Sequence, residues 1–102
     1  MSGHWTITDY DKTLTGELTG LLPPKIFDVH AHLYRVRDIN APSLALAHEG
    51  PDTVRVETWR ERLGALLPGA ELVGGLFFPY VARQCDNAAA NAFLVEQVST
   101  QP

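Results

Sequence analysis

The sequence predicts an α/β fold in which short parallel strands are connected by helices. Segments with helical and strand-like patterns alternate along the 102 residues, and this order favours parallel strands joined by helical crossovers. Two short runs are almost wholly apolar, as the strands of a buried parallel sheet are. The composition, with 45% hydrophobic and 20% charged residues, is that of a globular chain rather than a disordered one.

The first helix is predicted over residues 10–22, after an irregular tail at 1–9. Thr8 and Asp11 have the spacing of a capping box, with Asp in the place of the more usual Glu or Gln. Apolar residues then recur at helical spacing: Tyr10, Leu14, Leu18 and Leu21. The Pro-Pro pair at 23–24 ends the helix, because proline lacks the backbone donor and its ring clashes with the preceding turn.

The first strand is predicted over residues 26–33 and carries two histidines one residue apart. Side chains alternate between the faces of a strand, so His30 and His32 should project side by side, with Asp28 on the same face. The other residues of the run are apolar, which indicates a buried strand. Buried imidazoles need partners, and neutral imidazole is the commonest metal ligand in proteins. On the residues alone, a metal site and a pair of ordinary histidines are both open interpretations.

Residues 35–51 give no clear pattern, although 43–48 can form one helical turn. Loops of this length inside compact domains are often functional. A second helix is predicted over 53–67, where apolar residues recur along one side and charged residues fall largely on the other. Trp59 belongs to the apolar side, so we expect it in the core.

The second strand is predicted over 71–78, and a last helix over 86–99 with Asp86 as its N-cap. Two parallel strands with apolar residues on both faces do not make a complete sheet, because such sheets need further strands and helices on both faces. The outer edges of both strands should therefore be unpaired. We expect the chain to be the opening part of a larger α/β protein.

The charge and cysteine content exclude several classes of function. A net charge of −4 and a pI of about 5.4 argue against nucleic-acid binding. The single cysteine, Cys85, excludes an internal disulfide, favours a reducing compartment and is read as a plain thiol. There is no signal-peptide pattern, and no apolar run approaches the ~18 residues of a spanning helix. We expect a cytoplasmic protein with no membrane or nucleic-acid partner.

Residues 22–33, LPPKIFDVHAHL, resemble the first-strand motif of the amidohydrolase superfamily, in particular the amidohydrolase-related (amidohydrolase 2) branch. The resemblance covers residues 10–99, with 72–80 as the second strand. It implies that the chain is the N-terminal (βα)2 portion of a TIM (β/α)8 barrel, with a leading helix and the barrel incomplete. The sites of such barrels lie at the C-terminal ends of the strands.

The resemblance also implies roles for individual residues. His30 and His32 would be ligands of a divalent metal, most often zinc, and Asp28 would support them from the outer shell. Arg35 and Tyr80, which follow the two strands, are candidates for substrate contact. The family takes its remaining ligands and its catalytic Asp from later strands, so no catalytic residue is assigned here. The implied function is a metal-dependent hydrolase, in which metal-activated water attacks a carbonyl, C–N or C–O bond of a small-molecule substrate.

Other interpretations compete with this one. His48 and His4 are weaker candidates for a third metal ligand, and the chain alone is expected to be incomplete for catalysis. A metal-dependent decarboxylase or isomerase of the same branch is one alternative. A non-catalytic remnant or an oligomerising module of the same fold is another. The sequence leaves the substrate, the metal and the oligomeric state open.

Overall fold

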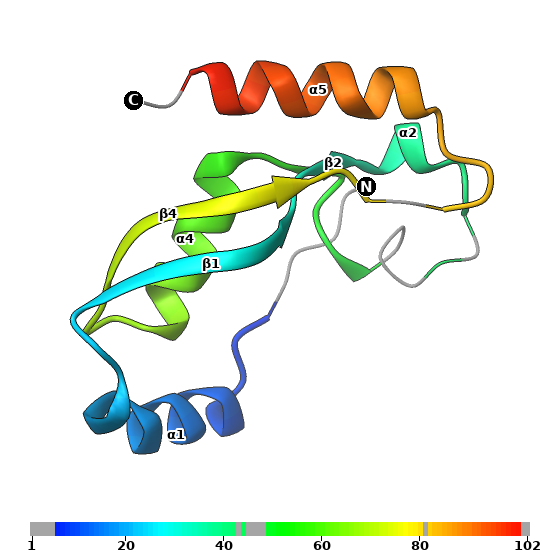
Figure 1. Ribbon diagram of the computed structural model, residues 1–102. Coiled ribbons are helices and arrows are strands. Elements are labelled where there is room, and N and C mark those ends of the chain that lie inside the picture. Colours follow the sequence, from blue (N-terminus) through cyan, green and yellow to red (C-terminus); the bar gives the residue numbers. More distant parts are fainter. Residues whose placement is uncertain (1–5, 43, 45–48, 81, 101–102) are drawn as a thin grey trace.

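The structure, a computed structural model, describes residues 6–42, 44, 49–80 and 82–100. It is a mixed α/β fold, as predicted, with helices and strands in alternation (Figure 1). The elements in chain order are α1 (Asp9–Leu18), the 3-10 helix η1 (Thr19–Leu21), β1 (Lys25–His32), β2 (Tyr34–Arg35), α2 (Val36–Ile39), β3 (Thr53–Val54), α4 (Val56–Leu66), β4 (Glu71–Phe78) and α5 (Asn87–Ser99).

The two long strands, β1 and β4, pair in parallel, which confirms the prediction. Their register is interrupted twice, and the second irregularity lies between Asp28 and Ala31. A second, antiparallel ladder joins β2 to β3, with Tyr34 opposite Val54. Within the described ranges the strands form these two-stranded sheets and do not close into a barrel.

The β1–β4 sheet is covered by α4 on one face, whereas none of the described helices lies over its other face (Figure 1). Neither strand is buried along its length, so the expectation of two buried strands is wrong. The reason is the missing second layer, because a parallel sheet becomes buried only when both faces are covered. The largest exposed side chains of the two strands are apolar: Phe27, Val29, Val73, Leu76 and Phe78.

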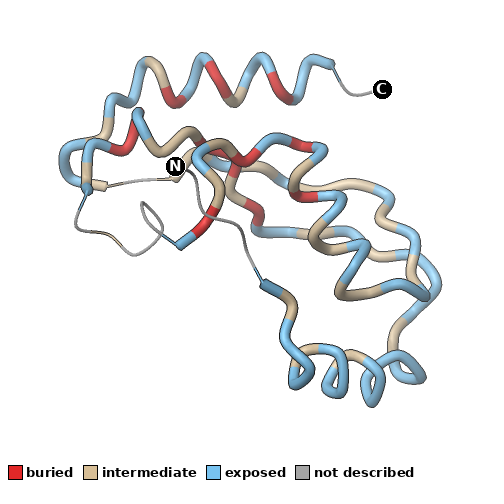
Figure 2. The backbone as a smooth tube through the Cα atoms, turned by 180° about the vertical axis from the view of Figure 1, so that it is seen from behind, coloured by how far each residue is buried: buried red, intermediate tan, exposed pale blue. Residues whose placement is uncertain are grey.

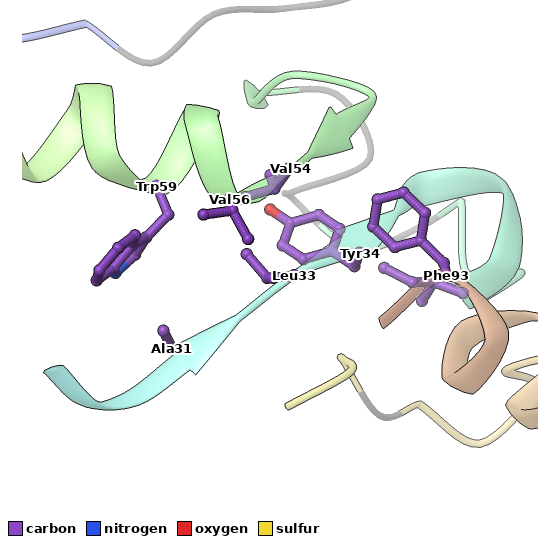
Figure 3. Packing of buried hydrophobic residues seen from close by; sticks show 8 residues of the cluster. Ala31, Leu33, Tyr34, Val54, Val56, Trp59 and Phe93 are labelled. Carbon is purple, nitrogen blue, oxygen red and sulfur yellow. The ribbon is translucent and has the colours of Figure 1, made fainter. Parts of the chain in front are cut away.

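The core lies where the end of β1 meets β2, β3, α4 and α5. Figure 2 shows the buried positions gathered in this region, while α1 carries none. Leu33 is fully buried and Trp59 is 7% exposed, as expected for the apolar side of the second helix. Figure 3 shows how the cluster packs, with the Trp59 ring over Ala31 and the rings of Tyr34 and Phe93 at its other end.

The stretch without a sequence pattern contains β2 and α2, which were not predicted. The second helix begins at Val56 rather than at residue 53, because Thr53 and Val54 pair with β2 as the short strand β3. Apolar residues at such a boundary suit either a strand or a helix, and pairing with β2 decides between them. The helical turn considered for 43–48 falls mostly outside the described residues.

The last helix runs from Asn87 to Ser99, and Asp86 caps it by accepting from the Ala89 backbone N–H, as predicted. A buried polar residue on this helix was not foreseen. The Gln97 side chain is 8% exposed, and its Oε1 accepts from the Val56 N–H at 3.1 Å. The first N–H groups of a helix have no partner within the helix, so Gln97 satisfies one of these donors of α4 and ties the two helices together.

The first helix has the predicted capping box, in which Thr8 and Asp11 bind each other's backbone N–H groups. Helical structure continues through η1 to Leu21, close to the predicted end at 22. The apolar residues that recur at helical spacing are exposed in the structure, and Tyr10 and Leu21 are 74% and 80% exposed. In Figure 1, α1 lies beyond the start of β1, away from the region that holds the core. None of the described helices is long and apolar enough to cross a bilayer.

Replacing Leu33 by Ala should destabilise the fold by about 2–5 kcal/mol, because it opens a cavity in the fully buried cluster. Urea unfolding followed by circular dichroism measures this change. Leu21→Ala is the matched control, because that side chain is largely exposed and its loss should leave the midpoint nearly unchanged. Equal effects of the two substitutions would contradict this core.

The capping box should make the stability of α1 depend on pH in the acid range. The pKa of Asp11 lies below its ordinary 3.8. The largest cause is the hydrogen bond from the Thr8 backbone N–H, and the Thr8 side chain lowers the pKa further. The support that ionised Asp11 gives to α1 is therefore complete above pH 3.8 and is lost as the pH falls through the lower, folded-state value. An NMR titration of the Asp11 carboxyl and of the α1 amides measures both effects.

The control is Thr8→Pro, which removes both the hydroxyl and the backbone donor at a residue whose φ of −83° suits proline. In this variant the pKa of Asp11 should rise toward 3.8. An unchanged titration would mean that the capping box does not form in solution.

Candidate functional site

The two histidines of β1 lie together at its C-terminal end, as predicted. Their Nε2 atoms are 3.2 Å apart, and their ring centroids are 5.0 Å apart. His30 is exposed and His32 is half-buried. The pair therefore faces outward from the sheet and is reachable from solvent, rather than buried within a core.

The irregularity in β1 separates Asp28 from this pair. Asp28 pairs with Gly75 and Ala31 with Phe77, so β1 advances three residues while β4 advances two. Such an extra residue is a β-bulge, which re-aims the side chains on either side of it. Asp28 and Ala31 consequently both face α4. The expectation that Asp28 shares a face with the imidazoles is wrong, because strict alternation stops at the bulge.

The Asp28 carboxylate instead holds the bulge and α4 together. Its Oδ2 accepts from the Trp59 indole Nε1–H at 2.8 Å, and its Oδ1 accepts from the His30 backbone N–H at 3.0 Å. Asp28 thus positions the His30 main chain and makes no hydrogen bond to either ring. Gly75 permits this arrangement, because a Cβ there would lie 3.3 Å from Trp59 Cζ2 and 3.1 Å from Phe77 Cζ.

The hydrogen bonds of His32 determine which of its nitrogens is free. Its Nδ1 lies 3.2 Å from the backbone oxygen of Pro79, and a carbonyl only accepts, so Nδ1 carries the proton. In the neutral ring the Nε2 lone pair is then available. It accepts from His30 Nε2–H in the structure, and the same lone pair would serve as a ligand to a cation. A backbone carbonyl at the second ring nitrogen is the usual arrangement behind a metal-binding histidine.

The spacing of the two Nε2 atoms fits a shared metal ion. With metal–nitrogen bonds of about 2.0–2.1 Å at a tetrahedral angle, two ligand nitrogens lie about 3.3–3.4 Å apart. The observed 3.2 Å is close to this spacing, and metal binding would require the His30 ring proton to move to Nδ1 and both Nε2 lone pairs to turn toward the ion. Among the residues that the structure describes, no third His, Cys, Asp or Glu joins the pair. His4 and His48 lie outside the described residues.

Aromatic side chains from β4 and the segment after it surround the pair. The Phe78 ring lies 5.5 Å from that of His30, and the Tyr80 ring lies 5.5 Å from that of His32. Tyr34 contacts Tyr80 in turn. Burial raises the pKa of Tyr34, and the nearby Tyr80 adds to this rise. Tyr34 therefore stays neutral near pH 7 and belongs to the core behind Tyr80.

The two candidates for substrate contact are placed differently. Tyr80 lies beside His32, as its position after β4 suggested. Arg35 is turned away, with its Nε 2.7 Å from Asp38 Oδ2 and its guanidinium over the Phe93 ring at 5.0 Å. The ion pair neutralises Asp38, which is only 7% exposed and would be costly to bury alone. Arg35 is thus part of the packing between α2 and α5.

Two features of the site escaped the sequence analysis, namely the Pro79 carbonyl and the Phe78 ring. The carbonyl could not have been found, because its role is a main-chain contact 47 residues distant from His32. The position of Phe78 follows once β1 and β4 are paired, since His32 lies opposite it in the register. Cys85 is a free thiol whose Sγ lies 3.5 Å from the Tyr80 backbone oxygen.

Comparisons of the chain with protein-family models, with curated proteins and with solved structures found no match.

The hydrogen bond between the Trp59 indole and Asp28 should contribute to the free energy of unfolding. Asp28→Ala leaves the part-buried indole N–H without its acceptor and should cost about 1–3 kcal/mol. Asp28→Asn keeps one accepting oxygen, which can serve the Trp59 indole N–H or the His30 backbone N–H but not both, so it should recover only part of this loss. Urea unfolding monitored by tryptophan fluorescence compares the two variants. Equal losses would contradict a role for the Asp28 oxygen as an acceptor.

Proposed function

We propose that this chain is the N-terminal part of a metal-dependent hydrolase of the amidohydrolase type, in which His30 and His32 bind a divalent cation. Zinc is the preferred candidate for this cation. The observation that carries the proposal is the 3.2 Å separation of the two Nε2 atoms. The lone pair that Pro79 leaves free on His32 supports it. Imidazole nitrogens at this spacing are suited to zinc and to other borderline metals.

The architecture is compatible with a portion of a (β/α)8 barrel. In such a barrel, parallel strands turn one face to an outer ring of helices and the other to the interior. Here β1 and β4 are parallel, and α4 covers one face of the sheet (Figure 1). Asp28 is turned to Trp59 of α4, whereas the two imidazoles beyond the bulge contact each other and Phe78 at the C-terminal end of β1. The open face corresponds to the interior that further strands would enclose.

The described residues account for part of the chemistry of such a site. A bound divalent cation would supply Lewis-acid activation of water and of a substrate carbonyl. Pro79 holds the proton of His32 on Nδ1, which keeps Nε2 available. Tyr80 is placed to orient a polar group of a small substrate beside His32, and Phe78 forms an apolar wall next to His30. The remaining ligands and the base that moves the proton belong to further strands in this proposal. A decarboxylase or isomerase would use the same ligand pair.

A non-catalytic, oligomerising module is the second candidate function. The exposed apolar face of β1 and β4 favours it. Phe27 is 49% exposed and Phe78 is 44% exposed on the two neighbouring strands. Contiguous apolar exposure of this kind is typical of surfaces that contact another protein.

Zinc binding tests the proposed site directly. The metal-free chain should bind zinc in an isothermal titration. His30→Ala or His32→Ala should weaken binding by more than the roughly 10- to 100-fold that outer-shell substitutions cost, because each removes a ligand. His48→Ala is the control, and it should leave the affinity unchanged.

Circular dichroism of each variant shows whether the fold is retained. A wild-type affinity in both His30→Ala and His32→Ala would refute the site. An equal loss in His48→Ala would instead show that this residue is a third ligand.

A further inference from the structure

The face of the β1–β4 sheet that carries the histidine pair has two features that a partner could use. Two ring nitrogens lie at the spacing of two ligands of one tetrahedral ion. Phe78 contacts the His30 ring, and Phe27 precedes Asp28 without a register shift between them, so by strand alternation Phe27 points away from the α4 side to which Asp28 is turned. The two side chains are 44% and 49% exposed. The outer edges of β1 and β4 are also without a strand partner in the part of the chain that is described. A partner for this face should therefore offer both ligands and apolar surface.

We propose that two copies of this chain bind one zinc ion between them, each through His30 and His32, with their open sheet faces in contact. The inference rests on the proposed metal site and names where the other two ligands of the ion come from. A second copy supplies two more imidazole nitrogens at the same 3.2 Å spacing, which completes a four-coordinate, all-histidine ligand set.

Symmetry makes a second copy suited to this surface. In a two-fold dimer the same patch meets itself, so residues close to the axis meet their own counterparts. The histidine pair is at the end of β1, with His30 exposed and His32 half-buried, so an axis through the ion would bring both pairs together. The Phe27 and Phe78 rings, which flank the pair along the two strands, would then be removed from water in both copies at once.

Charge also favours a cation at this contact. Each chain carries a formal net charge of −4, so two copies repel one another at long range. Neutral imidazoles add no further negative charge, and a divalent cation at the centre of the contact offsets part of the repulsion. Association should consequently depend on the metal rather than occur without it.

The test is the mass and metal content of the full chain with and without zinc. Sedimentation equilibrium of the metal-free chain should show a monomer, and zinc at half the chain concentration should give a dimer. Native mass spectrometry should find one zinc in each pair of chains. Chelation with EDTA should restore the monomer. The apparent dimerisation constant should strengthen at least tenfold on adding zinc.

The possible outcomes separate this proposal from the proposed metal site. A monomer that binds one zinc would overturn the dimer and leave the metal site standing. A chain that binds no zinc would overturn both. A dimer that forms equally well with EDTA would overturn the zinc-bridged contact. In a longer protein that contains this segment, a monomer with one zinc would likewise show that later strands cover the face.

Two matched variants test the surface itself. Phe27→Glu places a charge on the open face without altering a ligand, and it should weaken zinc-dependent dimerisation at least tenfold while zinc still binds. Val95→Glu makes the same kind of change at a 62% exposed position of α5 and should leave dimerisation unchanged. His32→Ala should abolish the zinc-dependent dimer. Dimerisation that resists Phe27→Glu, with the fold verified by circular dichroism, would overturn the proposed contact.

Discussion

The hydrogen bond from the Trp59 indole to the Asp28 carboxylate is the interaction on which the two faces of the sheet depend. It joins α4 to β1 at the bulge, and the same carboxylate binds the His30 backbone N–H. The polar end of a largely buried indole thereby finds a partner. Gly75 leaves the space that the ring occupies. This contact fixes the directions of the side chains on either side of the bulge. Asp28 and Ala31 point toward α4, and the imidazoles point away from it.

The consequence is a molecule with a packed side and an open side. On the packed side, Leu33, Val56 and Trp59 form a core with the rings of Tyr34 and Phe93. A buried Gln97 and the Arg35–Asp38 pair satisfy its polar groups. On the open side, the histidine pair is held by the Pro79 carbonyl and lies among aromatic rings. Burial gives the first side its stability, whereas exposure gives the second side access to a cation and to a partner.

The proposed metal site and the proposed dimer both depend on this open side. A strand that presents two imidazoles at ligand spacing supplies half of a tetrahedral site, and apolar neighbours make contact with another sheet favourable. In a complete barrel, further strands would meet both needs within one chain. In this chain, a second copy can meet them through one symmetric contact. Both arrangements use the same two nitrogens and the same sheet face.

The sequence by itself determined the α/β class, the parallel pairing of the two long strands and the last helix with its Asp86 cap. It also placed His30 and His32 side by side, because these features depend on local spacing and on nearby caps. Only the tertiary structure decided that Asp28 faces Trp59, since a bulge depends on the partner strand. The same holds for Thr53–Val54, which became a strand through pairing with β2, and for Gln97, whose partner lies 41 residues away. The exposure of β1 and β4 was not predicted for a related reason. Apolar residues indicate that a strand favours burial, but the strand becomes buried only when another layer covers it.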